Sequence, residues 1–132
     1  MKNLLILGIA LCFFSSCLEK VNPDTLKNTN WELTSITGIT LPASGTASLI
    51  FGDSLNVSGK SFCNSYGGKA EINEDKVSLK NLFSTKMFCQ DTDSSERAYL
   101  NALNETNNIK IVDNKLELLK DEKTLLVFTK VN

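Results

Sequence analysis

The sequence predicts an α+β domain in which an antiparallel, curled sheet of about seven or eight short strands packs around one α-helix. From Trp31 to Lys130, short apolar segments are separated by turn signals rich in Gly, Asp, Asn and Glu. Only the stretch that begins at Asp93 or Ser94 has its apolar residues at helical spacing. We therefore expect a cracked or half β-barrel that buries one sheet face against the helix.

The strand segments follow in order along the chain. Each combines apolar residues, in part alternating with polar ones, and ends at a turn or loop signal. The expected strands are 31–36, 47–51, 55–58, 69–73, 77–82, 109–112, 115–119 and 124–130. Residues 40–45 form a predicted loop with Pro42 and Gly45, and 59–68 form an irregular segment rich in Gly, Ser and Asn. Residues 83–93 are expected to be extended.

The helix is predicted from its cap, its first turn and its apolar stripe. Asp93 or Ser94 can cap the N-terminus, and Glu96 suits the positive end of the helix dipole. Tyr99 and Leu103 lie on one face at helical spacing. The polar run 106–108 is expected to end the helix.

Residues 1–16 have the features of a secretory signal peptide. Lys2 supplies a positive charge, Leu4 to Phe14 is an uncharged apolar run, and two serines precede Cys17. The run of about 11 residues is too short to span a bilayer as a helix, which takes roughly 20. This pattern predicts export.

The residues Phe14-Ser15-Ser16-Cys17 resemble the lipobox of bacterial lipoproteins, with Phe14 where Leu is usual. The resemblance implies cleavage before Cys17 and a membrane anchor through lipid on Cys17. Because Leu18 is not Asp, it further implies the outer membrane, on its periplasmic or surface face. Residues 17–29 are then the lipidated Cys and a polar tether, and 30–132 form the domain.

Composition excludes several classes of function. The chain has 132 residues, a formal net charge of −1 and no histidine. The missing histidine excludes Ser-His-Asp and Cys-His catalysis and histidine zinc sites. The charge balance argues against nucleic-acid binding. No glycine loop has a phosphate-binding pattern, and most carboxylates fall in predicted turns, so we expect no catalytic residue, no metal and no cofactor.

The cysteine count favours one disulfide. Of the 4 cysteines, Cys12 leaves with the signal peptide and Cys17 takes lipid, which leaves Cys63 and Cys89 in an oxidising compartment. A bond between them would close a loop of about 27 residues and contribute roughly 3.5 kcal/mol in the chain-entropy model. Two buried free thiols, a redox pair or metal chemistry are the alternatives.

The segment 59–68 resembles the first signature of the META domain, the family of HslJ-like heat-inducible bacterial lipoproteins. The family reads roughly G-x-x-G-C-N-x-x-x-G there, and the matching residues are Gly59, Cys63, Asn64 and Gly68. The second signature, T-x-M-x-C, is matched by Thr85, Met87 and Cys89. An early Trp-x-Leu, and an acidic residue, an aromatic and a leucine on the helix, also fit: Trp31, Leu33, Glu96, Tyr99 and Leu103. The resemblance covers about 31–130.

Two residues depart from the family pattern. Phe62 stands where the family has Gly, and Phe88 stands where a small residue is often found. Our hypothesis is that the two rings pack near the disulfide or enlarge an apolar, ligand-binding surface there.

The resemblance implies a non-enzymatic envelope lipoprotein with a stress-related role. We expect a monomer, attached to the membrane through Cys17, that binds a protein or small ligand. The alternative is a carrier or chaperone for a lipid or other apolar ligand, similar to lipid-binding pilot proteins. In that case aromatic residues would line a groove, although they could equally form the core: Phe51, Phe62, Phe83, Phe88, Tyr99 and Phe128.

Overall fold

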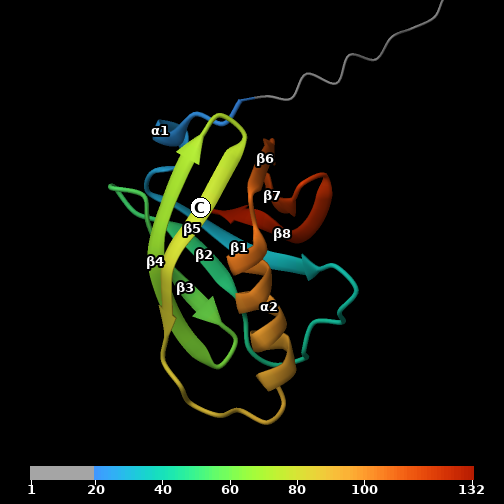
Figure 1. Cartoon of the computed structure of the whole chain (residues 1–132). Helices are drawn as coiled ribbons and strands as arrows, with labels where there is room; N and C mark the ends of the chain where they lie inside the picture. Colours follow the sequence, from blue (N-terminus) through green and yellow to red (C-terminus); the bar gives the residue numbers. More distant parts are fainter. Residues whose placement is uncertain (1–19) are drawn as a thin grey trace, which may run out of the picture.

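A computed structural model of the chain describes residues 20–132, and the signal peptide, Cys17 and Leu18 lie outside these residues. In this part of the chain, eight strands and two helices follow one another (Figure 1). Their bounds are α1 Pro23–Leu26, β1 Thr29–Ile36, β2 Ser48–Phe51, β3 Asn56–Ser61, β4 Asn64–Asn73, β5 Lys76–Ser84, α2 Asp93–Glu105, β6 Asn108–Val112, β7 Lys115–Lys120 and β8 Lys123–Val131. No helix among the described residues is both long and apolar enough to cross a bilayer.

The strands form one antiparallel sheet curled into a ring. Each strand pairs with the next along the chain, and β8 returns to pair with β1. The pairing between β5 and β6 is the weak point of the ring, because it rests on the single residue pair Lys76 and Asn108. Helix α2 connects these two strands and packs against the sheet (Figure 1). The predicted fold class, a curled sheet around one main helix, is therefore confirmed.

Helix α2 is held by the apolar stripe that the sequence predicts. Tyr99 and Leu103 are fully buried, and the Tyr99 ring meets the ring of Phe128 on β8 edge-on at 6.3 Å. The helix begins one residue earlier than expected, because Thr92 is the N-cap residue. Its hydroxyl is buried and finds no hydrogen-bond partner within residues 20–132. The first turn is stabilised instead by its acidic residues at the positive end of the dipole.

The expectation of an irregular segment over 59–68 is wrong. These residues belong to the hairpin of β3 and β4, which runs in continuous register from the pair Asn56 and Lys69 to the pair Ser61 and Asn64. Gly59 is one of the residues whose type argued against a strand here, and its packing explains why glycine is needed. A Cβ at this position would lie 2.0 Å from the carbonyl oxygen of Ser48, so β2 and β3 can approach only where β3 has no side chain.

The predicted tether is shorter than expected, since its second half packs on the domain. Val21 is buried, Leu26 is fully buried, and the Asn22 side chain caps α1 by accepting from the Asp24 N–H at 2.9 Å. The Trp31 indole donates to the Thr29 hydroxyl at 2.9 Å. Buried apolar surface at Val21 and Leu26 therefore extends the folded domain toward residue 20, and 30 is not its start.

The ends of β4 and β5 define two ends of the molecule. At one end, the Lys20 ammonium lies 3.0 Å from the Glu74 carboxylate in the β4–β5 turn. At the other, the Thr85 N–H donates to the Ser65 carbonyl at 2.9 Å. We call these the α1 end and the distal end. They are separated by the length of β4, whose 10 residues span roughly 30 Å.

Two tyrosines form a buried polar pair inside the ring. Their hydroxyls are 2.9 Å apart, and both lie within hydrogen-bond distance of the Ser48 carbonyl, Tyr66 at 2.7 Å and Tyr99 at 3.0 Å. Burial, which disfavours the phenolate, raises the pKa of both side chains well above the ordinary value of 10.0.

This pair predicts a specific alkaline behaviour, because Tyr66 and Tyr99 are the chain's 2 tyrosines. A folded-state pKa above the unfolded one gives stability that is complete below about pH 10 and is lost as the pH rises beyond it. We expect phenolate absorbance to stay near zero above pH 10 until the fold is lost, and then to rise in step with the loss of circular dichroism. Phenolate that titrates near pH 10 in folded protein would contradict the buried pair.

Candidate functional site

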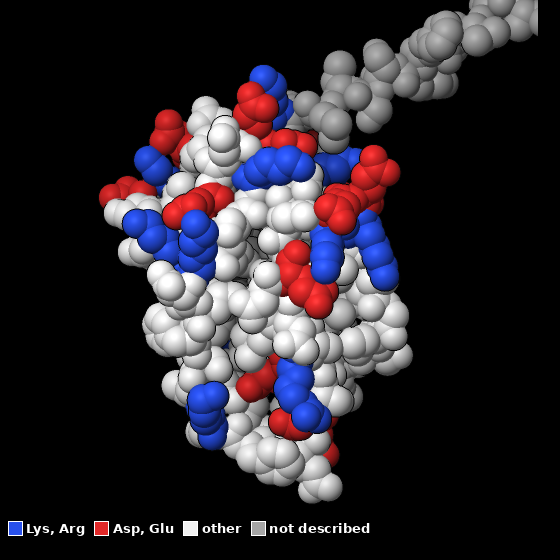
Figure 2. Space-filling model, in the orientation of Figure 1, with Lys and Arg blue, Asp and Glu red and all other residues white. Residues whose placement is uncertain are grey.

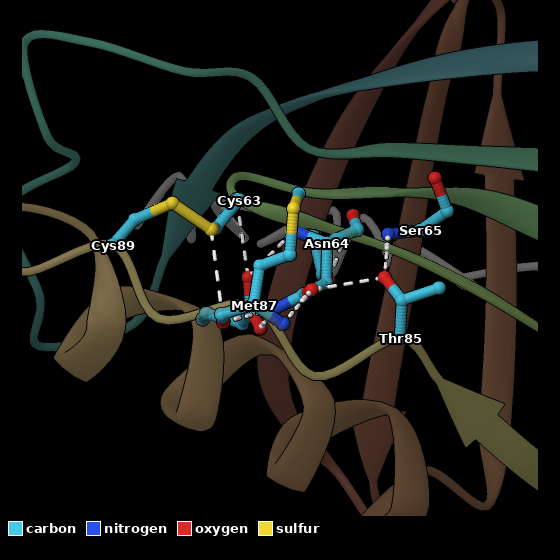
Figure 3. The surroundings of a disulfide bond; sticks show 8 residues. Cys63, Asn64, Ser65, Thr85, Met87 and Cys89 are labelled. Carbon is cyan, nitrogen blue, oxygen red and sulfur yellow. Dashed lines mark hydrogen bonds between the residues drawn. A yellow bond between two sulfur atoms is a disulfide. The ribbon is translucent and has the colours of Figure 1, made fainter.

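A disulfide joins the turn between β3 and β4 to the segment that precedes α2 (Figure 3). Cys63 and Cys89 have their Cα atoms 5.9 Å apart, and both residues are half-buried. The two family signatures are therefore brought together at the distal end, although 26 positions separate the cysteines.

The Asn64 side chain binds the second signature as a neighbouring strand would. Its Oδ1 accepts from the Met87 N–H at 2.7 Å, and its Nδ2 donates to the Met87 carbonyl at 3.0 Å. Oδ1 also accepts from the Thr85 hydroxyl at 2.9 Å. Asn64 is only 2 % exposed, so these bonds satisfy an amide that would be costly to bury alone.

Glu96 connects Asn64 and the β3–β4 turn to α2. We call this group of hydrogen bonds around the Asn64 side chain the Asn64 node. One carboxylate oxygen accepts from the backbone N–H groups of Cys63 and Asn64, at 3.1 and 3.0 Å. The other accepts from the Asn64 Nδ2. A carboxylate that receives these donors acts as a structural acceptor, and it fixes the hairpin turn to the first turn of the helix. The resemblance pointed to an acidic residue here, but it did not indicate this bonding.

Thr85 and Met87 have different roles in their signature. The Thr85 hydroxyl accepts from the Ser65 N–H at 3.1 Å and donates to Asn64 (Figure 3), so its side chain holds the segment to β4. Met87 is held through its backbone, while its side chain is 64 % exposed. Gly68 serves packing: a Cβ there would lie 2.8 Å from the Lys80 carbonyl oxygen.

Phe62 occupies a backbone position that favours glycine. It is the first of two turn residues between Ser61 and Asn64, and its φ is +73°. A two-residue hairpin turn with positive φ only at its first position has the pattern of type II′, where glycine is preferred. The half-buried Phe62 ring packs edge-on against Tyr99, at 6.2 Å and 78°. The ring contact offsets part of the backbone cost.

Phe62 and Phe88, the two bulky residues beside the cysteines of the disulfide, differ in exposure. Phe62 packs inward, whereas the Phe88 side chain is 75 % exposed. The other aromatic residues of the expected groove divide in the same way: Phe51, Tyr99 and Phe128 are fully buried in the core, and Phe83 is 70 % exposed. Aromatic side chains therefore fill the ring interior.

The exposed side chains Phe83, Met87 and Phe88 define what we call the distal patch. Phe83 lies over Gly67, where a Cβ would come within 2.8 Å of its ring. On the face shown in Figure 2, charged side chains crowd the α1 end and thin out toward the distal end. Large exposed apolar side chains within a short segment are characteristic of binding surfaces. Phe83 and Phe88 are among the aromatic residues of the expected groove, but the sequence does not indicate that they and Met87 are exposed while Phe51 and Phe128 are buried.

One acidic residue at this end forms an ion pair within α2. Asp93 pairs with Arg97 at 2.9 Å, one turn along the helix. Within residues 20–132, no cluster of three or more Cys, Asp or Glu side chains could hold a metal ion. The distal end therefore combines a rigid hydrogen-bonded node with an exposed apolar patch.

Comparisons with known proteins identify the fold family. The family model for the META domain matches residues 24–132. An NMR structure of a protein from Burkholderia xenovorans is 25% identical with a TM-score of 0.70, covering 82% of this chain and 85% of that chain. Another NMR structure is 22% identical with a TM-score of 0.67, covering 83% of this chain and 94% of its own. No curated protein matches the sequence.

The Asn64 node predicts a large cost for a nearly isosteric change. Asn64→Asp removes both amide donors and sets a second carboxylate against Glu96, so we expect a loss of about 4 kcal/mol in the free energy of unfolding. Asn73→Asp, on an exposed position of the same strand, is the control and should change stability by less than about 0.5 kcal/mol. Urea unfolding at pH 7 measures both. Equal costs for the two variants at pH 7 would show that the Asn64 node does not stabilise the fold.

The positive φ of Phe62 predicts that replacing this residue with glycine lowers stability less than replacing it with alanine. Phe62→Gly and Phe62→Ala both remove the contact with Tyr99, but only glycine adopts the positive φ at no cost. We expect the Gly variant to be more stable than the Ala variant by about 1 kcal/mol. Thermal unfolding of the pair isolates the backbone term, and an Ala variant of equal or higher stability would rule it out.

Proposed function

The chain belongs to the META domain family, and from that premise we propose that it is a non-enzymatic, lipid-anchored protein of the bacterial cell envelope that binds a partner through its distal patch. The observation that carries the proposal is the exposure of Phe83, Met87 and Phe88 at 70, 64 and 75 %. Three large apolar side chains exposed within six residues lower the solubility of a small domain, and binding offsets that cost.

The position of the patch supports a partner on the aqueous side. A lipid on Cys17 would lie only three positions before Lys20, a stretch of chain that reaches about 10 Å when extended. Lys20 lies at the α1 end, against Glu74. The patch lies roughly 30 Å away along β4, so an anchored domain would turn it away from the bilayer.

A binding role fits the chemistry of the distal end better than catalysis does. Glu96 and Asn64 use their polar atoms on each other and on the backbone, and Asp93 pairs with Arg97. A catalytic acid or base needs access to substrate, and these side chains are engaged within the fold. The rigidity that they confer suits a recognition surface, because an ordered surface loses little entropy on binding.

The location and the physiological role remain parts of the proposal. The lipobox-like residues before Cys17 and the absence of Asp at Leu18 support the outer membrane, with the domain on its periplasmic or surface face. The family resemblance supports a stress-related role. The carrier alternative has less support, because Phe51, Tyr99 and Phe128 fill the ring interior that an apolar ligand would need.

Site-specific photo-crosslinking in intact cells tests the binding face. We expect p-benzoyl-phenylalanine in place of Phe88 to give a discrete adduct, which Phe83→Ser reduces several-fold by removing a neighbouring patch side chain. The matched control replaces Val112, an exposed apolar residue of β6 at 49 %. The same adducts from both positions, or none from position 88, would contradict the proposal.

Fractionation of the same cells tests the proposed lipid anchor. Cys17→Ala should move the chain from the membrane fraction to the soluble fraction of the envelope, because lipid on Cys17 is the proposed attachment. A variant that stays in the membrane fraction would require another attachment.

A further inference from the structure

Residues 85–89 lie outside the regular strands, and the bonds of Thr85 and Met87 to Ser65 and Asn64 give them one paired edge, as in an extended chain. On the paired edge, the N–H and carbonyl of Met87 both bond to the Asn64 amide. In an extended chain the backbone groups of neighbouring residues point to the opposite edge. Within residues 20–132, the N–H and carbonyl groups of Lys86 and Phe88 have no hydrogen-bond partner. The free edge therefore offers two donors and two acceptors.

The segment is held in place at three successive points. Thr85 pairs with Ser65, Met87 pairs with Asn64, and Cys89 is bound through the disulfide. A strand that is already fixed pays little conformational entropy when another strand pairs with it. This free edge thus differs from an ordinary mobile loop, which would have to be ordered first.

The side chains around the free edge indicate the chemistry of an occupant. The distal patch of Phe83, Met87 and Phe88 is apolar, and the flexible thioether of Met87 can adapt to varied apolar partners. Lys86, which is exposed, is the one charged residue in 83–89. The edge therefore favours an apolar segment that also carries a carboxylate.

From these observations we infer that the free edge of residues 85–89 binds an extended, apolar segment of a partner protein, bearing an acidic residue opposite Lys86, as an added β-strand. The inference rests on the proposed function, in which the distal patch is the binding face. Backbone pairing would supply affinity, and the apolar side chains and Lys86 would supply selectivity. The proposed anchor on Cys17 would hold the bilayer at the α1 end, away from this edge, which favours a protein as occupant.

A peptide pair tests strand addition without altering the protein. The probe is a blocked peptide that alternates Val or Phe with Glu, and its partner has the same side chains with N-methyl groups on one backbone edge. We expect the unmodified peptide to bind at least about tenfold more tightly, because methylation removes donors for Lys86 and Phe88. Hydrogen exchange of the Lys86 and Phe88 amides should slow on binding.

Charge is tested with matched variants of the full-length domain. Lys86→Glu should weaken the acidic probe several-fold, whereas Lys115→Glu, on an exposed position of β7, should leave binding unchanged. Equal weakening by both variants would assign the effect to net charge and overturn the role of Lys86.

The outcomes separate this inference from the function on which it rests. If both peptides bind equally and contact Phe88, the patch binds apolar chains without strand pairing, and strand addition is wrong while the binding face stands. If neither peptide binds at millimolar concentration, although position 88 still forms its cellular adduct, strand addition is again wrong. Loss of the cellular adduct would instead remove the proposed function.

Discussion

The hydrogen bonds between Asn64, Glu96 and the backbone of Met87 hold three separate parts of the chain in one place. The β3–β4 turn, the segment before α2 and the first turn of α2 are joined by them, and none of these parts pairs with the others through regular secondary structure. An amide is suited to this position because it presents donors and an acceptor at once. The position of residues 85–89, and with it that of Met87 and Phe88 in the exposed patch, depends on this arrangement.

The disulfide and the Asn64 node stabilise the distal end in different ways. The bond between Cys63 and Cys89 acts mainly by restricting the unfolded chain. The bonds of Asn64 act only in the folded state, where they set the direction in which residues 85–89 run. A covalent link alone would leave this segment free to rotate about the bridge, and hydrogen bonds alone would leave it easier to detach. Together they give a short, irregular segment the rigidity of a strand.

Much of the fold could be predicted from the sequence, because hairpin turns and the α2 stripe have local signals. The cap of α2 was predicted at Asp93 or Ser94 and is observed one residue earlier, at Thr92, and the curled sheet is observed as expected. Local signals failed where a distant contact decides the structure. Gly59 lies in a strand because of Ser48, and Leu26 is buried by the sheet that follows it. The Asn64 node could be found only through the family signature, because no local pattern around Asn64 predicts its hydrogen bonds to Met87 and Glu96.

The pairing of β1 with β8 has a consequence for how the domain is made. A chain that is synthesised or exported from its N-terminus delivers β1 first and β8 last. The first strand must therefore wait, with one edge unpaired, until Lys123–Val131 arrive. Such long-range closure makes folding slow and leaves the incomplete ring open to pairing with other chains. In a crowded compartment, the interval between emergence and closure is the period when this protein most needs protection from aggregation.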